Sequence, residues 1–471
     1  MVTSAELYLA ARVDRVEAAI VEMEQNGFAL DVPFCEAGEA EARGQEETCL
    51  ARLNDWVFEQ GGYRGEPINW ASPIQVGKLL HDTMELPVSP VWKKGRVNLK
   101  AGERKLDETA LGWIRNRSEP SVRFGLDELV KLRRIRGAIK YLGKLPGYVA
   151  PDGLVHSVAG PASDGDARAG TITWRLAAKN PEVMQIPTDI KKDWFRVRKA
   201  FIAPPGHTLL VADEKALEVV ILGHILIRLF DDHQLADMVA PGAPDIHSTN
   251  ARLVFGQFLR WERHGRCVAE FPVAAFQSDE YPELQRLRQA IKEVWYGLMY
   301  GKGAYGFATS LRDAADNPIG EEAAGKIISA LYEAVPGVPR YQAFVLDYIQ
   351  QHHGIPGLGG AWCDLAELTQ SGDQWALKKA HRVAQNYPMQ EGGARVIGHA
   401  MVEISEDPLL RAAGLKLERQ VHDEFNWRLP MDSDRAMVKD RIRTHMTSYP
   451  LTSTLQVTIG EGANWDEAGN A

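Results

Sequence analysis

The apolar residues near the start of the chain repeat with a helical period. Apolar side chains at positions 13, 16, 20 and 23 lie three or four residues apart, and the stripe stops at Gly27. Such spacing puts the apolar groups on one face of an α-helix, and a glycine commonly follows its last turn. The pattern over residues 12–31 predicts a helix, a glycine cap and a short strand.

Three further segments in the first third of the chain carry local signals. Ser72 and Pro73 precede spaced apolar positions within 69–88, and a proline after a serine is typical of a helix start. The segment 126–145 predicts a second long helix. A Pro-Asp-Gly turn at 151–153 then precedes a strand candidate at 154–158, so the chain changes character there.

The apolar run 207–212 has the length of a strand and is followed by Asp213. Helical spacing resumes from 217 to 228, so Asp213 and Glu218 flank a strand-to-helix corner. The carboxyl ends of strands in αβ proteins often carry chemistry. Two interpretations of Asp213 stay open: an aspartate that caps the next helix, or a metal ligand.

A strand–turn–strand pattern surrounds a second pair of carboxylates. Asp423 and Glu424 are adjacent and stand among large apolar residues between Leu417 and Leu429. Two neighbouring carboxylates that lose hydration repel one another, which is costly unless a cation compensates. A divalent metal is the natural compensating cation.

Four side chains follow one another at steps of four in the segment 288–301, namely Arg288, Lys292, Tyr296 and Tyr300. At about 100° per residue they spread over roughly 120° of a helix surface, so they share a face. An arginine and a lysine one turn apart can cradle phosphate, and aromatic rings can stack on a base. The segment indicates a nucleotide site. The alternative is an ordinary amphipathic helix with buried tyrosines.

Composition limits the class of protein. A chain of 471 residues with 45% hydrophobic residues should fold into two or three subdomains. Its net charge of -9 excludes nucleic-acid binding by bulk charge alone, so local patches matter. One run of cations could follow a phosphate backbone, or form a solvated helix face. It consists of Lys131, Arg133, Arg134, Arg136, Lys140 and Lys144.

The four cysteines are scattered and lack zinc-ligand spacing, which indicates neither a disulfide framework nor a zinc site. No apolar run reaches membrane-spanning length, and the first ten residues do not look like a signal peptide. A soluble protein of the cytoplasm is expected, without a membrane partner.

Several of these segments resemble, in order, the motifs of the family A DNA polymerases (DNA polymerase I type). The segment 288–301 reads R-x3-K-x3-Y-G-x2-Y-G, as the fingers-helix motif B does, and 420–424 reads Q-V-H-D-E, as motif C does. Asp213 and Glu218 match motif A, although Glu214 and Val220 depart from it. The match is most similar to the replicative polymerases of bacteriophages.

The resemblance implies a mixed α+β fold of the right-hand type, with an antiparallel palm sheet and a helical thumb and fingers. It assigns 1–150 to the N-terminal helix and thumb, and 151–235 to the first part of the palm with motif A. Residues 236–385 form the fingers with motif B, and 386–471 the second part of the palm with motif C. About ten residues precede the first helix, so an exonuclease domain is expected to be absent.

The resemblance also implies a two-metal phosphoryl transfer with Mg²⁺, for which Mn²⁺ could substitute. The metal ligands would be the side chains of Asp213 and Asp423 and the backbone carbonyl of Glu214. Glu424 would belong to the same catalytic group, and Lys292 could protonate the leaving pyrophosphate.

The implied nucleotide site combines contacts to each part of a deoxynucleotide. Arg288, Lys292 and His247 would hold the triphosphate, and Glu218 would exclude a 2'-hydroxyl. Tyr296 would stack against the sugar and base and, like other family members with tyrosine here, permit dideoxynucleotides. Tyr300 would end the helix against the templating base.

The implied DNA contacts come from several segments. Arg175 would lie at the primer terminus, beside Trp174 where the family has glycine. The other DNA contacts would be Arg382, Asn386, Gln390, His422, Lys131 and Arg134. The three polar residues from 382 to 390 would read the minor groove. The basic G-R-R-R triplet of the family is absent at 357–364, and the segment 255–285 looks like an insertion without a readable role.

The expected function is therefore DNA-templated addition of deoxynucleotides to a primer 3' end, without intrinsic proofreading, in phage DNA replication. Primer-template DNA and dNTPs are the expected partners, with a processivity factor, a helicase or primase, or a separate exonuclease as further candidates. If the chain is phage-encoded, its location is the cytoplasm of the bacterial host. Two competing hypotheses are a template-binding scaffold that has lost activity and a metal-dependent nuclease.

Overall fold

A four-stranded antiparallel sheet forms the centre of the computed structural model, which describes residues 4–61, 65, 67–88, 106–160, 175–186, 195–299, 301–308, 311 and 319–470. Its strand order is β11-β12-β6-β13. The strands are β6 (His207–Glu214), β11 (Lys416–Val421), β12 (Glu424–Pro430) and β13 (Val457–Gly462). β6 pairs on both sides, so the apolar run 207–212 lies inside the sheet.

The two faces of β6 serve two different cores. Leu210 and Ala212 pack in the large core that includes the helices behind the sheet. Leu209 and Val211 pack in a smaller core on the opposite face. Because successive side chains of a strand alternate between faces, Asp213 continues the second set and Glu214 continues the first.

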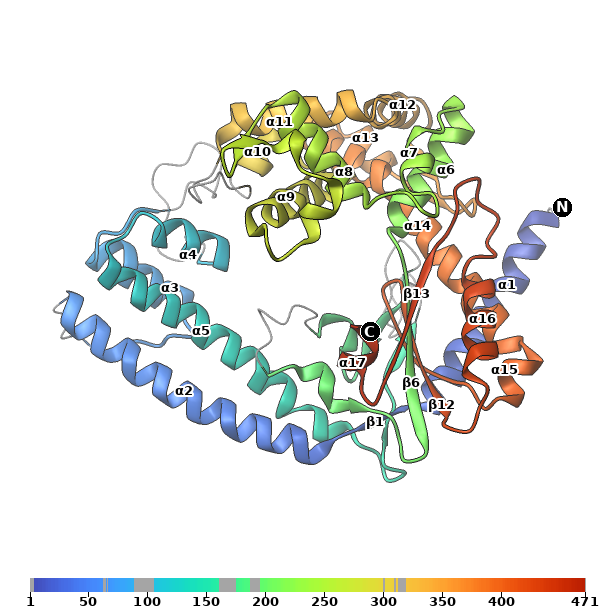
Figure 1. Ribbon diagram of the computed structural model, residues 1–471, viewed down its shortest axis with the longest axis horizontal. Coiled ribbons are helices and arrows are strands. Elements are labelled where there is room, and N and C mark those ends of the chain that lie inside the picture. Colours follow the sequence, from blue (N-terminus) through green and yellow to red (C-terminus); the bar gives the residue numbers. More distant parts are fainter. Residues whose placement is uncertain are drawn as a thin grey trace.

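A pair of long helices extends away from the sheet (Figure 1). α2 (Val32–Gly61) and α5 (Pro120–Leu142) lie side by side, and α3 (Pro73–Lys78), the π-helical turn Leu79–Thr83 and α4 (Glu108–Arg115) cover their outer end. Their core holds three tryptophans of this arm, Trp56, Trp70 and Trp113, among leucines and isoleucines.

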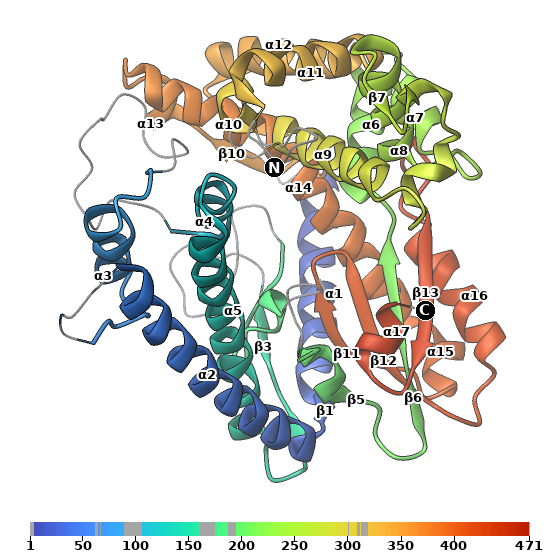
Figure 2. The ribbon, with the colours of Figure 1, turned by 60° about the vertical axis from the view of Figure 1, so that its left-hand side comes forward.

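A layer of helices lies at the other end of the sheet, across from the α2–α5 pair (Figures 1 and 2). Its elements are α6 (Leu217–Phe230), α7 (Gln234–Met238), α8 (Ile246–Ala251), α9 (Pro282–Met299), α10 (Ala304–Ala308), α11 (Gly320–Ala334), α12 (Gly337–His352) and α13 (Ala366–Thr369). Between α8 and α9 lie the π-helical turn Arg252–Phe258 and the hairpin of β7 (Glu262–Arg263) and β8 (Arg266–Cys267). Another hairpin joins β9 (Gly354–Pro356) to β10 (Trp362–Asp364).

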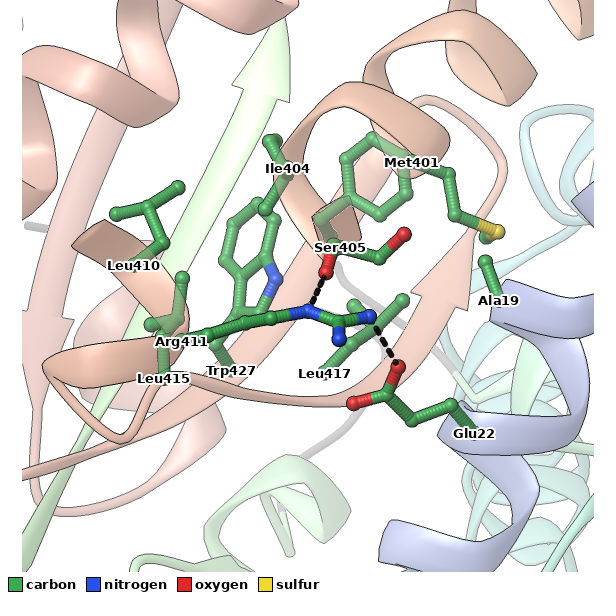
Figure 3. Close-up of a pocket in the computed structure, with 11 residues that line it drawn as sticks. Ala19, Glu22, Met401, Ile404, Ser405, Leu410, Arg411, Leu415, Leu417 and Trp427 are labelled. Atoms are coloured by element: carbon green, nitrogen blue, oxygen red, sulfur yellow. Dashed lines mark hydrogen bonds and ion pairs between the residues drawn. The ribbon is translucent and has the colours of Figure 1, made fainter. Parts of the chain in front are cut away.

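Helices α1 (Ser4–Asn26), α14 (Gln374–Glu406), α15 (Pro408–Ala412) and α16 (Arg435–Met446) cover the back of the sheet, and α17 (Trp465–Gly469) follows β13. Figure 3 shows an apolar pocket where α1, α14, α15 and the sheet meet. Arg411 crosses it, donating to the carbonyl of Ser405 and pairing with Glu22 of α1 at 3.7 Å. These contacts attach the first helix to α14 and α15.

Short strands complete the fold. β1 (Phe28–Leu30) pairs with β2 (Leu154–Val155) and β5 (Phe201–Ile202), and β3 (Val158–Gly160) pairs with β4 (Ala177–Lys179). The described residues include no helix long and apolar enough to cross a membrane.

Most of the predicted elements are confirmed, with shifted ends. α1 ends before Gly27, which has a φ of 54°, and the Ser72 hydroxyl caps α3 by accepting from Gln75. α5 begins at Pro120 instead of 126, and the strand candidate at 154–158 is split between β2 and β3. β6 continues through Asp213 and Glu214, because both residues still pair with neighbouring strands.

Two glycines of α5 give opposite expectations for stability. A Cβ at Gly125 would lie 2.0 Å from the Trp56 ring, whereas a Cβ at Gly137 would meet no atom within 4 Å. We expect Gly125→Ala to destabilise the protein by about 1–3 kcal/mol through overpacking. Gly137→Ala should stabilise it by roughly 0.5–1 kcal/mol, because alanine loses less backbone entropy in a helix.

Urea unfolding of both variants measures the difference. Equal effects of the two substitutions would contradict the packing of α5 on α2.

Candidate active site

The pairing of β12 with β6 brings the two predicted acidic segments together. Glu424 is the cross-strand partner of Asp213, and the backbone amide of Glu214 donates to the carbonyl of Asp423 at 3.3 Å. Asp423 lies in the two-residue turn between β11 and β12, where His422 has a φ of 58°. Residues 210 positions apart in the sequence thus become neighbours.

The pKa values of this group match a cluster of carboxylates whose repulsion nearby cations offset only in part. Burial, followed by the charges of Asp423 and Glu424, raises the pKa of Asp213 to about 7, although the charges of Arg198 and Lys292 lower it. Burial also raises the pKa of Asp423. A low-dielectric site with several acids disfavours the charged form of each, so the group favours a bound cation.

Glu214 differs from its two acidic neighbours. It is 2% exposed, and both carboxyl oxygens lack a hydrogen-bond partner in the structure. Burial followed by the charge of Asp213 raises its pKa to about 8. Since its side chain follows the opposite face of β6 from Asp213, Glu214 would offer its backbone carbonyl to the site.

The capping interpretation of Asp213 is wrong. The residue before α6 is Ala216, which has a φ of 50°, and no side chain caps this helix. The left-handed backbone at Ala216 turns the chain from β6 into α6. Asp213 is thereby left in the strand, facing Glu424.

Glu424 is held by groups that the sequence interpretation missed. Its carboxylate accepts from the Trp465 indole at 2.6 Å and from the Asn426 amide at 2.7 Å, and Arg198 lies 3.5 Å away. The Arg198 guanidinium also stacks over the Trp465 ring at 3.9 Å. With its oxygens engaged, Glu424 is positioned by the fold, and it acts on Asp213 through its charge.

Arg175 and Glu218 form a direct ion pair, 2.6 Å from Nη2 to Oε1. Both influence Asp423, whose pKa is lowered by the charge of Arg175 and raised by that of Glu218. The pair therefore lies beside the carboxylate turn. His422, also assigned to this region, is exposed at the turn itself.

The predicted face of α9 is present, and its residues do not belong to the core. Arg288, Lys292 and Tyr296 are half-buried, whereas Leu287, Ile291, Val294, Trp295 and Leu298 form the buried stripe of the helix. The charge of Lys292 lowers the pKa of Asp213, so this face is turned toward the carboxylates. Tyr300 and Trp174 lie outside the described residues.

Arg288 is held in place by α8. Its guanidinium donates two hydrogen bonds to Asp245, at 2.8 and 2.9 Å, and this carboxylate also caps α8 through the Ser248 amide at 2.7 Å. The bonds to Arg288 and Ser248 lower the pKa of Asp245 despite burial. His247 follows Asp245, and its ring lies 5.9 Å from that of Tyr296.

His247 has the environment of a neutral hydrogen-bonding group. It is 5% exposed, burial lowers its pKa to about 4, and its Nδ1 atom lacks a hydrogen-bond partner. A buried polar atom without a partner costs free energy unless a ligand satisfies it. His247, Arg288, Lys292 and Tyr296 together surround one region beside the carboxylates.

α14 meets the far end of α9. A Cβ at Gly301, which has a φ of 70°, would lie 2.3 Å from Cγ of Arg382, so only glycine permits this approach. Asn386 and Gln390 continue from Arg382 at steps of four along α14 and are half-buried. The three residues thus share a helix face that leads from the end of α9 toward the sheet.

The basic run of α5 is partly neutralised by neighbours. Arg134 pairs with Glu108 at 3.0 Å, Arg136 pairs with Glu46 at 2.6 Å, and Arg133 donates to the carbonyl of Leu106. The positive charge of the track that the sequence suggested is therefore reduced. DNA contacts by Lys131 and Arg134 stay a prediction.

The side chains of the site supply only part of the ligands that a metal ion needs. Within the described ranges, no group of three or more His, Cys, Asp or Glu side chains converges as a metal cage would. Mg²⁺, however, is commonly bound by one or two carboxylates and completes its shell with water and substrate phosphates. Asp213 and Asp423, whose pKa values are raised by burial, match that arrangement.

Comparison with known proteins assigns the family. The model of DNA polymerase family A matches residues 39–467. The chain is 30% identical to the thermostable DNA polymerase I of Thermus filiformis over 98% of its own length and 48% of that protein. It is 29% identical to DNA polymerase I of Deinococcus radiodurans, over 94% of this chain and 40% of the relative. The chain belongs to the family A DNA polymerases.

A solved structure supports the same assignment. The structure of the polymerase domain of Pol1 from M. smegmatis, in complex with DNA primer-template and dNTP, superposes with a TM-score of 0.79 at 25% identity. The match covers 97% of this chain and 70% of that one. The mixed α+β fold with a right-hand arrangement is thus confirmed. The chain spans less than half the length of the two relatives above, both of which are bacterial.

The raised pKa of Asp213 predicts a pH-dependent stability. The folded carboxyl titrates near 7 and the unfolded one near 3.8. The folded state therefore binds more protons between these values, and its stability falls as pH rises through them. In EDTA at pH 8, Asp213→Asn should be more stable than the parent by on the order of 1–3 kcal/mol.

Thermal unfolding from pH 4 to 8, with EDTA or Mg²⁺, measures this effect. Mg²⁺ should stabilise the parent at pH 8 more than Asp213→Asn. Asp440→Asn, which alters an exposed carboxylate of α16, is the control. A parent and an Asp213→Asn variant with the same pH profile would contradict the assignment.

Proposed function

We propose that the protein is a DNA-templated DNA polymerase that adds deoxynucleotides to a primer 3' end. The observation that carries the proposal is the pairing of β12 with β6, which sets Asp213 and Asp423 together beneath the Arg288–Tyr296 face of α9. Carboxylates beside a phosphate-binding and base-stacking helix match what nucleotidyl transfer needs. The complex of the M. smegmatis domain with primer-template and dNTP supports the same reaction.

Asp213, Asp423 and the Glu214 carbonyl would hold two Mg²⁺ ions, with Mn²⁺ as a substitute. Bound there, the metals supply activation of the primer 3'-hydroxyl and neutralisation of the leaving pyrophosphate. Glu424 would keep the local potential negative from its fixed position. Lys292 would deliver a proton to the leaving group.

The incoming nucleotide would lie along α9. Arg288 would grip the γ-phosphate with a planar fork, and neutral His247 would donate a hydrogen bond to a phosphate oxygen. Tyr296 would stack on the sugar and base. Glu218, fixed by Arg175, would occupy the space of a 2'-hydroxyl, and Tyr300 would face the templating base.

The new base pair would be read by α14. Arg382, Asn386 and Gln390 present polar groups at helical spacing, which suits minor-groove acceptors that are similarly placed in all base pairs. Arg175 and His422 would contact the primer and template near the carboxylate turn. Lys131 and Arg134 would contact the DNA backbone from α5.

The finer predictions rest on sequence alone and stay predictions. They comprise the phage origin and role, the cytoplasmic location, the absence of proofreading, the subdomain boundaries and the further replication partners. The scaffold hypothesis is disfavoured because Asp213, Asp423 and Lys292 influence one another, which a scaffold does not need. A nuclease has no use for the Tyr296 face.

Primer extension tests the function. The parent should extend a labelled primer with Mg²⁺ and four dNTPs, and Asp423→Asn should lower the rate by about 10³-fold or more, since several kcal/mol of metal-mediated charge stabilisation is lost. Asp440→Asn is the matched control and should extend normally. A parent that binds template but does not extend would favour the scaffold hypothesis.

Tyr296 predicts acceptance of dideoxynucleotides, because its phenol could replace the contact of a missing 3'-hydroxyl. Tyr296→Phe should lower kcat/KM for dideoxynucleotides about tenfold, the worth of one well-placed hydrogen bond, and leave dNTP incorporation nearly unchanged. Single-turnover incorporation of both substrates gives the ratio. Tyr305→Phe, at a 40% exposed tyrosine of α10, is the control. An unchanged ratio in Tyr296→Phe would remove this role.

A further inference from the structure

The outer end of α14 carries an exposed tryptophan. Trp375 is 64% exposed, more than any other exposed large hydrophobic residue in the described ranges. The ammonium of Lys378 lies 5.3 Å from the centre of its ring. A large ring in water is unfavourable, and an exposed aromatic beside a cation is typical of surfaces that bind single-stranded nucleic acid.

The position of Trp375 on the helix is not arbitrary. At about 100° per residue, Trp375, Lys379, Arg382, Asn386 and Gln390 fall within roughly 80° of one another. Trp375 and Lys379 therefore extend the face proposed to read the new base pair. We call Trp375, Lys378 and Lys379 the outer α14 surface.

The outer α14 surface lies beyond the templating end of α9. Arg288 and Lys292 mark the phosphate end of that helix, and Gly301, at the other end, packs against Arg382. Trp375 is seven residues further out on α14 than Arg382, which is about 10 Å along the helix. This distance corresponds to a few nucleotides of single strand.

The charge of this surface suits phosphate. Lys378, Lys379 and Arg382 are exposed, and no salt bridge among the described residues involves any of them. The chain as a whole carries a net charge of -9, so cations without a salt-bridge partner in the described ranges stand out locally.

We propose that the outer α14 surface binds the single-stranded template just ahead of the templating base. Trp375 stacks on an unpaired base, and Lys378 and Lys379 contact the adjoining phosphates. The inference rests on the proposed polymerase function and adds the single-stranded part of the template to its substrate. Duplex DNA does not fit the same contact, because its bases are already stacked on one another.

The experiment compares primer-templates whose 5' template overhang is one or six nucleotides long. The parent should bind the longer overhang more tightly, by about tenfold if one base stacks. Trp375→Leu should lose this gain and keep the affinity for the short overhang, whereas Trp375→Phe should keep both. The comparison of leucine with phenylalanine separates stacking from simple apolar contact.

Salt dependence tests the cations. Lys378→Gln with Lys379→Gln should lower the slope of log affinity against log salt by about 1.4 for the long overhang, which corresponds to two released counterions. Lys416→Gln, at an exposed lysine of β11, is the control for a lost surface charge.

Three results would decide otherwise. The inference is overturned if Trp375→Leu retains the parental gain with overhang length, or if it weakens both substrates equally, as a duplex or general surface contact would. A parent that fails to bind the short-overhang substrate would remove the proposed function, and this inference with it. One-nucleotide extension on the short overhang should persist in Trp375→Leu, so the two failures are distinguishable.

Discussion

The register between β6 and β12 is the constraint on which the rest of the site depends. A shift by one residue would send Asp213 to the opposite face of the sheet, since side chains alternate along a strand. The register is fixed by the two cores that β6 separates, with Leu210 and Ala212 on one side and Leu209 and Val211 on the other. Hydrophobic burial thus holds the carboxylates of Asp213 and Glu424 close together, although their charges repel one another.

The support behind the carboxylates is itself polar and buried. Arg419, fully buried beside Glu424 in the sheet, is surrounded by the rings of Phe28, Phe201 and Trp465 at about 5 Å. Burial lowers the pKa of Arg419 to about 10. An arginine in an aromatic cage gains cation–π attraction where water is excluded. β1, β5 and α17 therefore meet at one guanidinium of β11, the strand that pairs with β12.

Much of the site could be predicted from sequence because its signals are local. The apolar residues around Asp423 indicated a strand–turn–strand, and steps of four indicated the face of α9. The extent of β6 was underestimated, because its apolar run stops at Ala212 while its pairing continues. The supports of Glu424 were missed for a different reason. Arg198 and Trp465 approach it from segments 226 and 41 residues away, and no periodicity records such contacts.

The basic run of α5 shows the same limit of prediction from sequence, here for a feature that was expected and is only partly present. Its spacing indicated a cationic track, but Glu108 and Glu46 arrive from other helices and pair with Arg134 and Arg136. A count of charges along one segment cannot include acids that only the tertiary fold supplies. The same reasoning gives weight to Lys378 and Lys379, since no salt bridge in the described part of the chain reaches them.

The ion pair of Arg288 with Asp245 makes the protein its own competitor for the proposed nucleotide site. The Asp245 carboxylate already accepts two hydrogen bonds from the Arg288 guanidinium, which would otherwise bind a terminal phosphate. Any anion that binds must displace it or share it, so the affinity for a ligand is a difference between two charge-assisted contacts. A singly bound phosphate, such as one in a DNA backbone, gains little from that exchange, whereas a triphosphate that also reaches Lys292 and His247 gains several contacts at once. The internal acid Asp245 can in this way favour the binding of a triphosphate over the binding of the DNA backbone.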